Sequence, residues 1–447
     1  MRPDIPNNEP VIAVGLLQGV QGVSFRLSGE YEDGTGQCFS EGEYRVDCHE
    51  GMLRCTGARS VESKELVFRP IDKDSARFSL ETTIGIDFHW QQKEQQTFSG
   101  GLRLLPSGDD RFTIINDVPL EAYLTSVICS EMDASSPLEL IKAHSVISRS
   151  WLLAQRKKRP PRSDDGSHSI ESEGERIRWY DHEAHRDFVV CADDHCQRYH
   201  GVGRIKSSNA IRAVGETRGQ VLTYDGKLCD ARYGKCCGGV TEAFSVAWAD
   251  DEVPYLIPLL DGPGEKVPLP NLAHDETLRE YLCNPPDVYC NCTDEQILGA
   301  ILTPHDRKTL DFFRWSVQLS AAETSDLLRE KLGIDLGRVL ALEPVERGLS
   351  GRLKRLRCVG ERGSLVIGKE LEIRRALSKS HLYSSAFVVD IEGSADCPES
   401  FILRGAGWGH GVGLCQIGAA VMAWQGTRCV EILSHYYPGT SMERLYE

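Results

Sequence analysis

Short apolar runs separated by Gly, Asp and Pro fill the first part of this 447-residue chain. Runs of this length and composition are typical of β-strands. They lie at Val11–Leu16, Val23–Leu27, Glu43–Cys48, Leu66–Arg69, Arg77–Leu80 and Ile84–Trp90. The pattern therefore predicts a β-rich N-terminal region.

Apolar residues spaced three and four apart begin near residue 119 and indicate two helices up to residue 157. Pro119 suits the first turn of the first helix, and Glu131 falls at its end. After a polar break, Ser135 or Ser136 would cap the second helix, with Pro137 at its first position. One face of the second helix would carry Leu140, His144, Ile147 and Trp151. Glu131 would lie at a helix–loop–helix corner, where apolar neighbours could raise its pKa.

The rest of the chain mixes strand-like and helical patterns. In order, we expect a polar surface loop at 158–177, strands near 187–190 and 219–224, two or three helices within 255–340 (Ala321–Leu332 the clearest), and a β-hairpin at Lys354–Val359 and Ser364–Ile367 near the apolar run Ile373–Leu377. No internal repeat stands out. The predicted class is α+β.

A dense group of glycines marks the C-terminal part. Six glycines lie between positions 405 and 418, interleaved with Trp408, His410 and Gln416. Glycine allows tight bends and close approach of other groups. Helical patterns follow, the first closing at Gly426. The sequence predicts a strand end, a turn that presents one imidazole and one amide, and then a helix. Taken alone, the glycines favour a tight structural turn with a packed Trp.

Three blocks in the same order resemble the SpoIID/LytB family, named for sporulation stage II protein D and the amidase enhancer LytB. They are Leu120–Arg149, with its LE, EM, KA and R positions; Lys235–Trp248 (KCCGGVTEAFSVAW); and Gly407–Thr440, with GWGHGVG and HYYPGT. The resemblance covers roughly residues 100–440. It implies a division into a β-rich region at 1–115, a first catalytic part at 116–250, a mostly helical insertion at 251–350 and a second catalytic part at 351–447.

The resemblance also implies an activity. SpoIID-like proteins are lytic transglycosylases of peptidoglycan that prefer strands stripped of stem peptides, and LytB-like relatives are described as enhancers of a muramoyl-alanine amidase. Glu131 matches the family's acid. It would protonate the glycosidic oxygen and then deprotonate the C6 hydroxyl of the N-acetylmuramoyl unit, which closes on C1 to give a 1,6-anhydro end. The substrate supplies the nucleophile, so one carboxyl suffices where ordinary glycosidases need two. Without the resemblance, Glu131 would be taken for a solvated helix-end carboxylate.

Other matched residues would line the same elongated, curved groove. Arg149 would hold the Glu131 carboxylate or bind sugar, unless it is a surface helix arginine. The substrate-binding residues implied by the resemblance are Gly238, Gly239, Thr241, Glu242, Trp408, His410 and Gln416. His410 could instead be a hydrogen-bonded core residue, and Trp408 could anchor the turn. His144 and Cys415 stand where many relatives have Gln and Ser.

Four metal-binding side chains lie within residues 185–196, namely His185, Cys191, His195 and Cys196. Two thiolates and two imidazoles suit tetrahedral zinc. Some SpoIID relatives carry a Cys/His zinc site here. The four residues predict structural zinc, with His182 and His200 as competing ligands. A disulfide, or two buried thiols beside surface histidines, is the alternative.

Composition limits which cellular compartments and which binding partners are possible for this chain. The net charge of −15 argues against an electrostatic nucleic-acid binder. No apolar run is long enough to span a membrane, and the N-terminus has no pattern of a cleavable signal. The chain would act in the cell envelope if a signal was trimmed, on glycan strands and with an amidase as a further partner. A third hypothesis, besides the transglycosylase and the amidase enhancer, is a cytoplasmic protein without contact to the cell wall. The 16 cysteines are scattered and do not decide the compartment.

Overall fold

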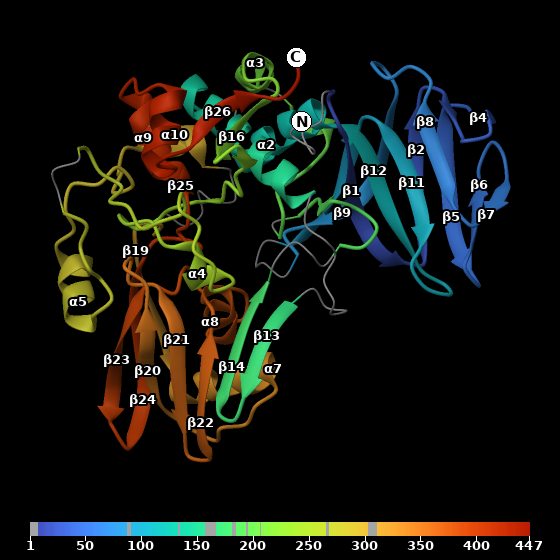
Figure 1. Ribbon diagram of the computed structural model, residues 1–447. Helices are drawn as coiled ribbons and strands as arrows, with labels where there is room; N and C mark the ends of the chain where they lie inside the picture. The colour runs from blue at the N-terminus through green and yellow to red at the C-terminus, as the bar shows by residue number, and fades with distance from the viewer. Residues whose placement is uncertain are drawn as a thin grey trace. The chain divides into compact units, whose positions relative to one another are not determined.

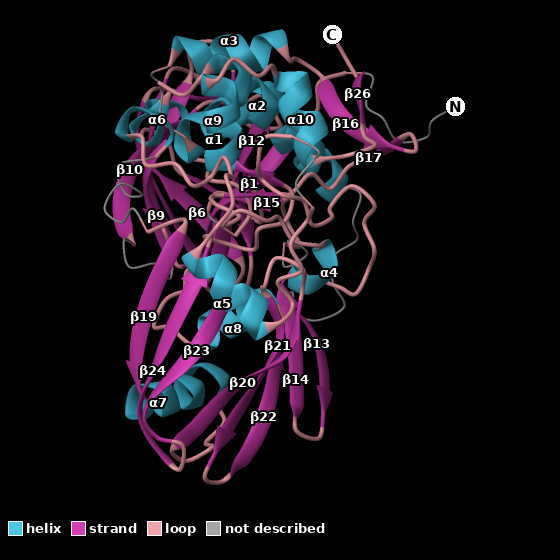
Figure 2. Ribbon diagram, turned by 90° about the vertical axis from the view of Figure 1, so that its left-hand side faces the viewer, coloured by secondary structure: helices cyan, strands magenta, loops and turns pink. Residues whose placement is uncertain are grey.

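The computed structural model describes residues 8–86, 91–132, 135–156, 167–180, 185–193, 195–205, 207–264, 268–302 and 311–447. The chain forms two compact units, each built from separate stretches of sequence. Unit 1 comprises 1–160, 185–221 and 442–447, and unit 2 comprises 161–184 and 222–441. The α+β class is confirmed (Figures 1 and 2). The four-segment division stays a prediction.

Unit 1 begins with two facing sheets (Figure 1). Their strand orders are β15-β1-β12-β11-β8-β3-β4 and β10-β9-β2-β5-β6-β7. The bounds are β1 Val11–Val20, β2 Gly22–Ser28, β3 Tyr31–Glu32, β4 Cys38–Phe39, β5 Gly42–His49, β6 Met52–Thr56, β7 Val61–Ser63, β8 Leu66–Pro70, β9 Arg77–Ile84, β10 Gln92–Phe98, β11 Gly101–Pro106, β12 Phe112–Pro119 and β15 Val190–Cys191. Burial alternates along β2 and β5 because one face of the second sheet meets the first. The Phe25 and Phe68 rings, one from each sheet, lie 5.3 Å apart.

Helices follow the sheets in unit 1. They are α1 Leu120–Glu131, α2 Leu138–Gln155, the 3₁₀ turn η2 Val202–Arg204 and α3 Ser208–Glu216. Strands β16 Gln220–Tyr224 and β26 Ser441–Arg444 each contain a boundary between the two units, and with β17 Lys227–Leu228 of unit 2 they form a small sheet. Pro119 and Pro137 occupy the N-cap positions of α1 and α2, with no side-chain cap. The predicted cap at Ser135 or Ser136 is therefore wrong, because the fixed φ of Pro137 already gives the N-cap conformation.

Unit 2 contains two further sheets and the glycine-rich turn. The sheet orders are β13-β14-β22-β21-β20 and β19-β24-β23, with a separate pair β18-β25. The strand bounds are β13 Ser167–Ser172, β14 Glu175–Tyr180, β18 Tyr233–Gly234, β19 Arg314–Ser320, β20 Val339–Arg347, β21 Leu353–Gly360, β22 Gly363–Gly368, β23 Phe387–Ser394, β24 Cys397–Ala406 and β25 Leu414–Cys415. The helix bounds are α4 Phe244–Ala247, α5 Asp275–Cys283, α6 Glu295–Ile301, α7 Ala321–Leu332, α8 Glu370–Ala376, α9 Gln416–Trp424 and α10 Cys429–Tyr436.

The core of unit 2 lies between these two larger sheets. Figure 2 shows α7 and α8 between the two groups of strands, and both helices pack against strands as well as against each other. α7 matches its predicted range because Ser320 caps its start and the left-handed Gly333 ends it. The predicted strand end, glycine turn and two C-terminal helices are confirmed by β24, α9 and α10.

Several predicted elements need correction. The stretch 167–177, predicted as loop, belongs to the hairpin β13–β14, because β14 pairs with β22 nearly two hundred positions later, a partner that no local pattern reveals. The strand predicted at 84–90 ends at Ile84, where Gly85 turns the chain with φ +65°; residues 87–90 are outside the described ranges. Residues 373–376 of the apolar run belong to helix α8, and Leu377 is its C-cap. Segment 251–350 includes strands β19 and β20 besides its helices.

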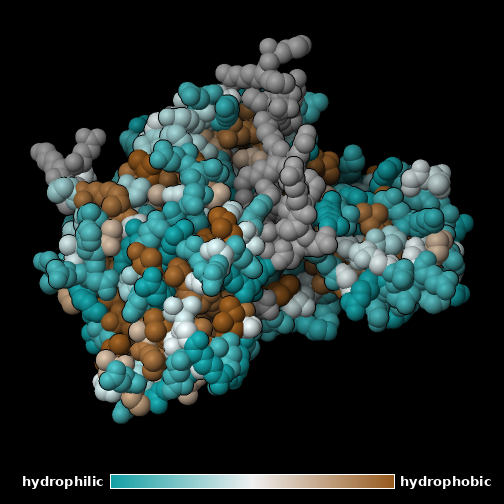
Figure 3. Space-filling model, turned by 60° about the horizontal axis from the view of Figure 1, so that its bottom comes forward, coloured by the Kyte–Doolittle hydropathy of each residue, from teal (hydrophilic) through white to brown (hydrophobic). Residues whose placement is uncertain are grey.

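Apolar side chains on the surface are scattered. On the face drawn in Figure 3, brown patches are broken up by hydrophilic side chains. Among the described residues, no helix is long and apolar enough to cross a membrane.

Candidate functional site

Glu131 is the last residue of α1 and is half-buried. The backbone N–H of Arg198 donates a hydrogen bond of 3.2 Å to its Oε1 atom. The neighbouring Met132 is buried, and its N–H bonds to the carbonyl of Ile128. The carboxylate is therefore oriented at a helix end where solvent still reaches it.

The segment that supplies the Arg198 amide is fixed along α1. The rings of Tyr199 and Tyr123 stack at 5.1 Å, and the Tyr199 hydroxyl donates to Asn116 at 2.6 Å. Ser126 donates its hydroxyl to the carbonyl of Gly201 at 2.7 Å. These buried contacts, made by residues directly after Arg198, hold its backbone in place.

The four predicted zinc ligands come together just before this segment. Their ligand atoms all lie within 4.8 Å of one another. His185 Nε2 is 3.3 Å and His195 Nδ1 is 3.4 Å from Cys196 Sγ, and His195 Nδ1 is 4.0 Å from Cys191 Sγ. Tetrahedral zinc places bound S and N atoms about 3.5 Å apart. The donor set and its spacing therefore fit one zinc ion.

The local backbone structure explains how four ligands with irregular sequence spacing come together. Strand β15, which ends at Cys191, pairs in parallel with β1. The Asp193 carboxylate accepts the N–H groups of Gly85 and Ile86 at 3.0 and 2.9 Å. Hydrogen bonding with Cys196, and then with His185 and His195, holds the pKa of the Cys191 thiol well below its ordinary value.

Of the alternatives to this ligand set, the structure speaks against the disulfide and against His200, while two metal-free thiols beside histidines stay an alternative. None of the sixteen cysteines, all within the described ranges, forms a disulfide. His200 is buried and is not part of the group, and His182 is outside the described residues.

Arg149 has a different partner from the predicted one. Its fully buried guanidinium binds the Glu121 carboxylate through Nε at 3.0 Å and Nη2 at 2.6 Å. Nη1 donates to the carbonyls of Ser145 and Gln220. Burial removes it from reach of a sugar, and these contacts anchor helices rather than hold Glu131. Glu121 also accepts from Tyr446 Oη at 2.6 Å. Sequence reasoning missed this role of Glu121, although the residue lies in the first matched block.

In unit 2, the two matched glycine segments lie side by side, as predicted. Cys236 and Trp408 form an antiparallel bridge, with Trp408 N–H donating to the Cys236 carbonyl at 2.8 Å. Glu242 and Val412 form a parallel bridge. The segment at 235–248 thus packs along the turn at 407–413.

Most of the predicted substrate-binding residues in this wall are internal. Thr241, Glu242 and Gln416 are buried. Glu242 accepts from the Ser350 hydroxyl at 2.7 Å and from two backbone N–H groups, while burial raises its pKa. A Cβ at Gly238 would meet Gly407 N at 2.8 Å, and one at Gly239 would meet Tyr281 Oη at 2.0 Å. The glycines therefore admit other parts of the protein rather than a saccharide.

Trp408 and His410 are half-buried. The Trp408 ring packs on Phe312 at 4.8 Å and on Tyr383 at 5.0 Å, so it anchors the turn. His410 Nδ1 accepts the Val412 N–H at 3.0 Å, which requires a neutral ring with its proton on Nε2. Burial, with nearby arginines adding to it, lowers the pKa of His410 to about 3. His410 thus behaves as a neutral, hydrogen-bonded turn residue.

The predicted single cleft joins residues of both units. Glu131 and Arg149 belong to unit 1, while Gly239 and His410 belong to unit 2. Each unit is described by itself, so the shared groove stays a prediction.

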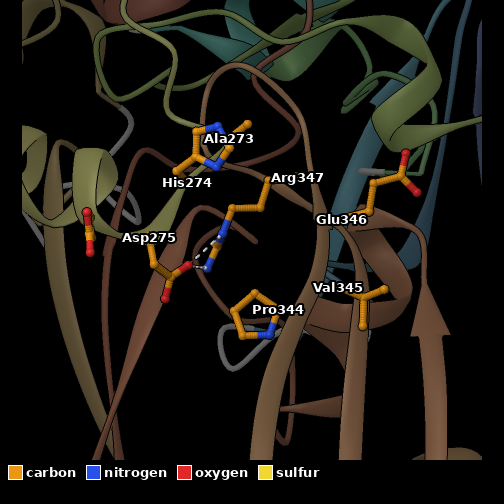
Figure 4. Close-up of a pocket in the computed structure, with 8 residues that line it drawn as sticks. Ala273, His274, Asp275, Pro344, Val345, Glu346 and Arg347 are labelled. Atoms are coloured by element: carbon orange, nitrogen blue, oxygen red, sulfur yellow. Dashed lines mark hydrogen bonds and ion pairs between the residues drawn. The ribbon is translucent and has the colours of Figure 1, made fainter.

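A pocket of about 390 Å³ lies elsewhere in unit 2. Figure 4 shows the Arg347 guanidinium pointing to the Asp275 carboxylate, at 2.8 Å, with His274 above them. Pro344, Val345 and Glu346 come from β20 on the other side. Arg347 is already bound to Asp275 and two carbonyls, and no residue of the matched motifs lines this pocket.

Two family models match parts of this chain. A family model described as "Stage II sporulation protein" (SpoIID) matches residues 108–224, and a model of a domain of unknown function (DUF8618) matches residues 242–413. Residues 108–224 of this α+β protein, which include Glu131, are thus similar to the SpoIID family, and this match confirms the family resemblance.

Curated relatives are distant. The amidase enhancer of Bacillus subtilis is 24% identical over 334 residues, which cover 71% of this chain and 40% of that protein. Stage II sporulation protein D of Bacillus amyloliquefaciens is 23% identical over 332 residues, covering 73% and 75%. The protein of the same name from Bacillus subtilis is 22% identical over 333 residues, with the same coverage. The matched region thus spans less than half of the amidase enhancer.

Proposed function

We propose that this chain is a lytic transglycosylase that cleaves the bond between N-acetylmuramoyl and N-acetylglucosaminyl units of peptidoglycan, preferably in strands without stem peptides. The observation that supports this most is Glu131, a half-buried carboxylate at a helix end in the SpoIID domain, oriented by the Arg198 amide. The proposed setting is the cell envelope.

Glu131 would act first as an acid and then as a base. Its proton goes to the glycosidic oxygen as that bond breaks. The resulting carboxylate takes the proton of the C6 hydroxyl, whose oxygen closes on C1. No water is consumed, and the carboxyl returns to its starting state. Arg149 is left out of this chemistry because it is buried on Glu121.

The four residues at 185–196 would hold zinc in a structural role. Four protein ligands leave no open position for a substrate or water, so the ion would stabilise its own loop. Arg198 follows Cys196 by two residues, so this loop carries the amide that orients Glu131. The cluster's contribution to catalysis would be to hold that amide in place.

The alternative function is a non-catalytic protein that binds peptidoglycan and stimulates an N-acetylmuramoyl-L-alanine amidase. The similarity to a protein named amidase enhancer supports this alternative function. Glu131, which such a role does not need, favours the enzyme.

Mass spectrometry of digested peptidoglycan distinguishes the enzyme from the non-catalytic enhancer. Purified glycan strands without stem peptides and intact sacculi would be incubated with the full chain and with Glu131→Gln. The enzyme yields 1,6-anhydro ends, which are lighter by one water than hydrolysis products, and the variant yields far fewer. Stimulation of a purified amidase by both proteins, with no anhydro ends from either, would overturn the proposed activity in favour of the enhancer.

A further inference from the structure

A second group of metal-binding side chains lies in the core of unit 2. Cys237, Asp261, Cys290 and Cys415 are all buried, and their ligand atoms lie within 4.8 Å of one another. They come from four separate segments, and Cys415 is the last residue of β25. We call these four residues the buried thiol cluster.

The spacing of the cluster fits a single ion. With Zn–S bonds of about 2.3 Å, two thiolates of a tetrahedral site lie about 3.8 Å apart. The Sγ atoms of Cys237 and Cys290 are 3.6 Å apart. A disulfide would need about 2.05 Å. All four ligand atoms lie within 4.8 Å of one another, a spacing that suits a single ion.

Hydrogen-bond donors point at the ligand atoms. The Cys237 N–H donates to Cys415 Sγ at 3.2 Å, and the Gly239 N–H donates to Cys237 Sγ at 3.4 Å. The Cys290 N–H donates to Asp261 Oδ2 at 3.1 Å, and Tyr436 Oη donates to Oδ1 at 2.6 Å. Donors of this kind stabilise anionic ligands and fix their orientation around a metal.

The Asp261 carboxylate is a second, independent indication that a cation binds at the buried thiol cluster. It is completely buried, and an ionised carboxylate in such a position costs several kcal/mol unless positive charge compensates it. The nearby Arg314 guanidinium interacts electrostatically with Cys290, but it donates to backbone carbonyls, including those of Gly238 and Tyr281. Three thiolates and one carboxylate carry four negative charges, of which a divalent cation would neutralise two and Arg314 one.

Helix α9 has a glycine where it packs against the buried thiol cluster. A Cβ at Gly418 in α9 would lie 2.4 Å from Asp261 Oδ1 and 2.4 Å from Tyr436 Oη. The absence of a side chain at 418 is what lets the carboxylate and the phenol reach this position. Cys236 lies beside the cluster and interacts with Cys290 and Cys415, but it is outside the group of mutually close atoms.

We propose that Cys237, Cys290, Cys415 and Asp261 bind one zinc ion in a closed structural site. Thiolates select soft or borderline cations, and the tetrahedral set suits zinc. The ion would join the segment at 236–239 to the start of α9, and so brace the wall that carries the glycine-rich turn. This site is separate from the His/Cys group of unit 1 and does not depend on the proposed activity.

Metal analysis of the full chain tests the proposal. The variant His185→Ala/Cys196→Ser removes the first ligand set, and we expect it to retain about one zinc per chain by elemental analysis. Adding Cys415→Ser should remove that zinc or make it easy to extract with a chelator. Serine has nearly the same size and shape as cysteine, so the variant is expected to fold. The matched control is Cys358→Ala, a buried thiol in another part of the core, which should leave the metal content unchanged.

A spectroscopic measurement covers the case in which a variant misfolds. Cobalt exchanged into the His185→Ala/Cys196→Ser protein should show thiolate-to-metal charge transfer of the intensity given by three thiolates, and X-ray absorption of the zinc form should show three sulfurs and one light ligand. Zinc-free, folded protein would overturn the proposal. So would a Cys237–Cys290 disulfide found by mass spectrometry without reductant.

Discussion

The backbone N–H of Arg198 and the carboxylate of Glu131 are joined by a 3.2 Å hydrogen bond across 67 positions of sequence. The candidate acid and the His/Cys cluster are therefore parts of one local structure in unit 1, because Arg198 follows Cys196 closely. A backbone hydrogen bond of this type can orient a carboxylate without taking part in bond making.

Replacing Glu131 with Gln should lower glycan cleavage by about 10²–10⁴-fold, since general acid–base catalysis contributes about that much. Gln keeps the size of the side chain and can still accept the Arg198 N–H, so the fold should be kept. Rates would be measured from the release of anhydro ends. The control is Glu139→Gln at the start of α2, which should retain the wild-type rate. A loss of less than about tenfold in Glu131→Gln would contradict the assigned role.

Cys196→Ser should remove one zinc per chain and lower glycan cleavage at least about tenfold, because the loop that carries Arg198 loses its anchor. Elemental analysis and the release of anhydro ends check the two effects. Cys38→Ser, at an exposed cysteine in β4, is the matched control. Full activity in a variant that holds no zinc at this site would show that the cluster does not support Glu131.

Arg149→Met should lower the free energy of unfolding by about 3–5 kcal/mol, because it leaves the buried Glu121 carboxylate without its cation. The double variant Glu121→Gln/Arg149→Met removes both charges and should recover part of that loss. Urea denaturation measures both values. If Arg149 were catalytic after all, the double variant would be folded but inactive.

Gly418→Ala should destabilise the protein, although Ala is the better helix former by about 1 kcal/mol. The new Cβ would collide with Asp261 and Tyr436. Gly215→Ala in α3 is the matched control, since a Cβ there meets nothing within 4 Å and should raise stability by roughly 0.5–1 kcal/mol. Thermal unfolding compares the two. Equal stabilisation by both changes would show that α9 moves freely away from Asp261.

The stability of unit 2 should fall as the pH drops below about 6.5. A histidine in the unfolded chain titrates near that value, whereas burial lowers the pKa of His410 to about 3. Between these values only the unfolded state takes up the proton, so His410 alone should cost about 1.4 kcal/mol per pH unit. Chemical denaturation at several pH values would give this slope. His410→Asn, whose amide oxygen can accept the Val412 N–H, should show a correspondingly flatter dependence, and an unchanged slope would contradict the neutral state of His410.

The sequence located the elements with strong local patterns. Strands β1, β2, β5 and β8 and helices α1, α7 and α9 follow from apolar spacing, caps and glycines, which act within a few residues. The hairpin β13–β14 was missed because it is polar, and its pairing with β22 depends on residues far away in sequence.

The candidate site was predictable in part for the same reason. The ligand set at 185–196 lies within one short segment, so residue type alone suggested it. The partner of Arg149 and the internal positions of Thr241 and Glu242 depend on how distant segments pack. Asp261 had no local signal at all, and only the fold brings it to three cysteines.

The bond from Tyr446 to Glu121 bears on the order in which the chain is made. Tyr446 lies in the third stretch of unit 1, after all of unit 2. A chain emerging from the ribosome or through a membrane would expose α1 long before this phenol arrives, while unit 2, nearly continuous, could close meanwhile. The Glu121 region should therefore be the last part of unit 1 to reach its final packing, and the stage at which a chaperone or protease has the longest access to it.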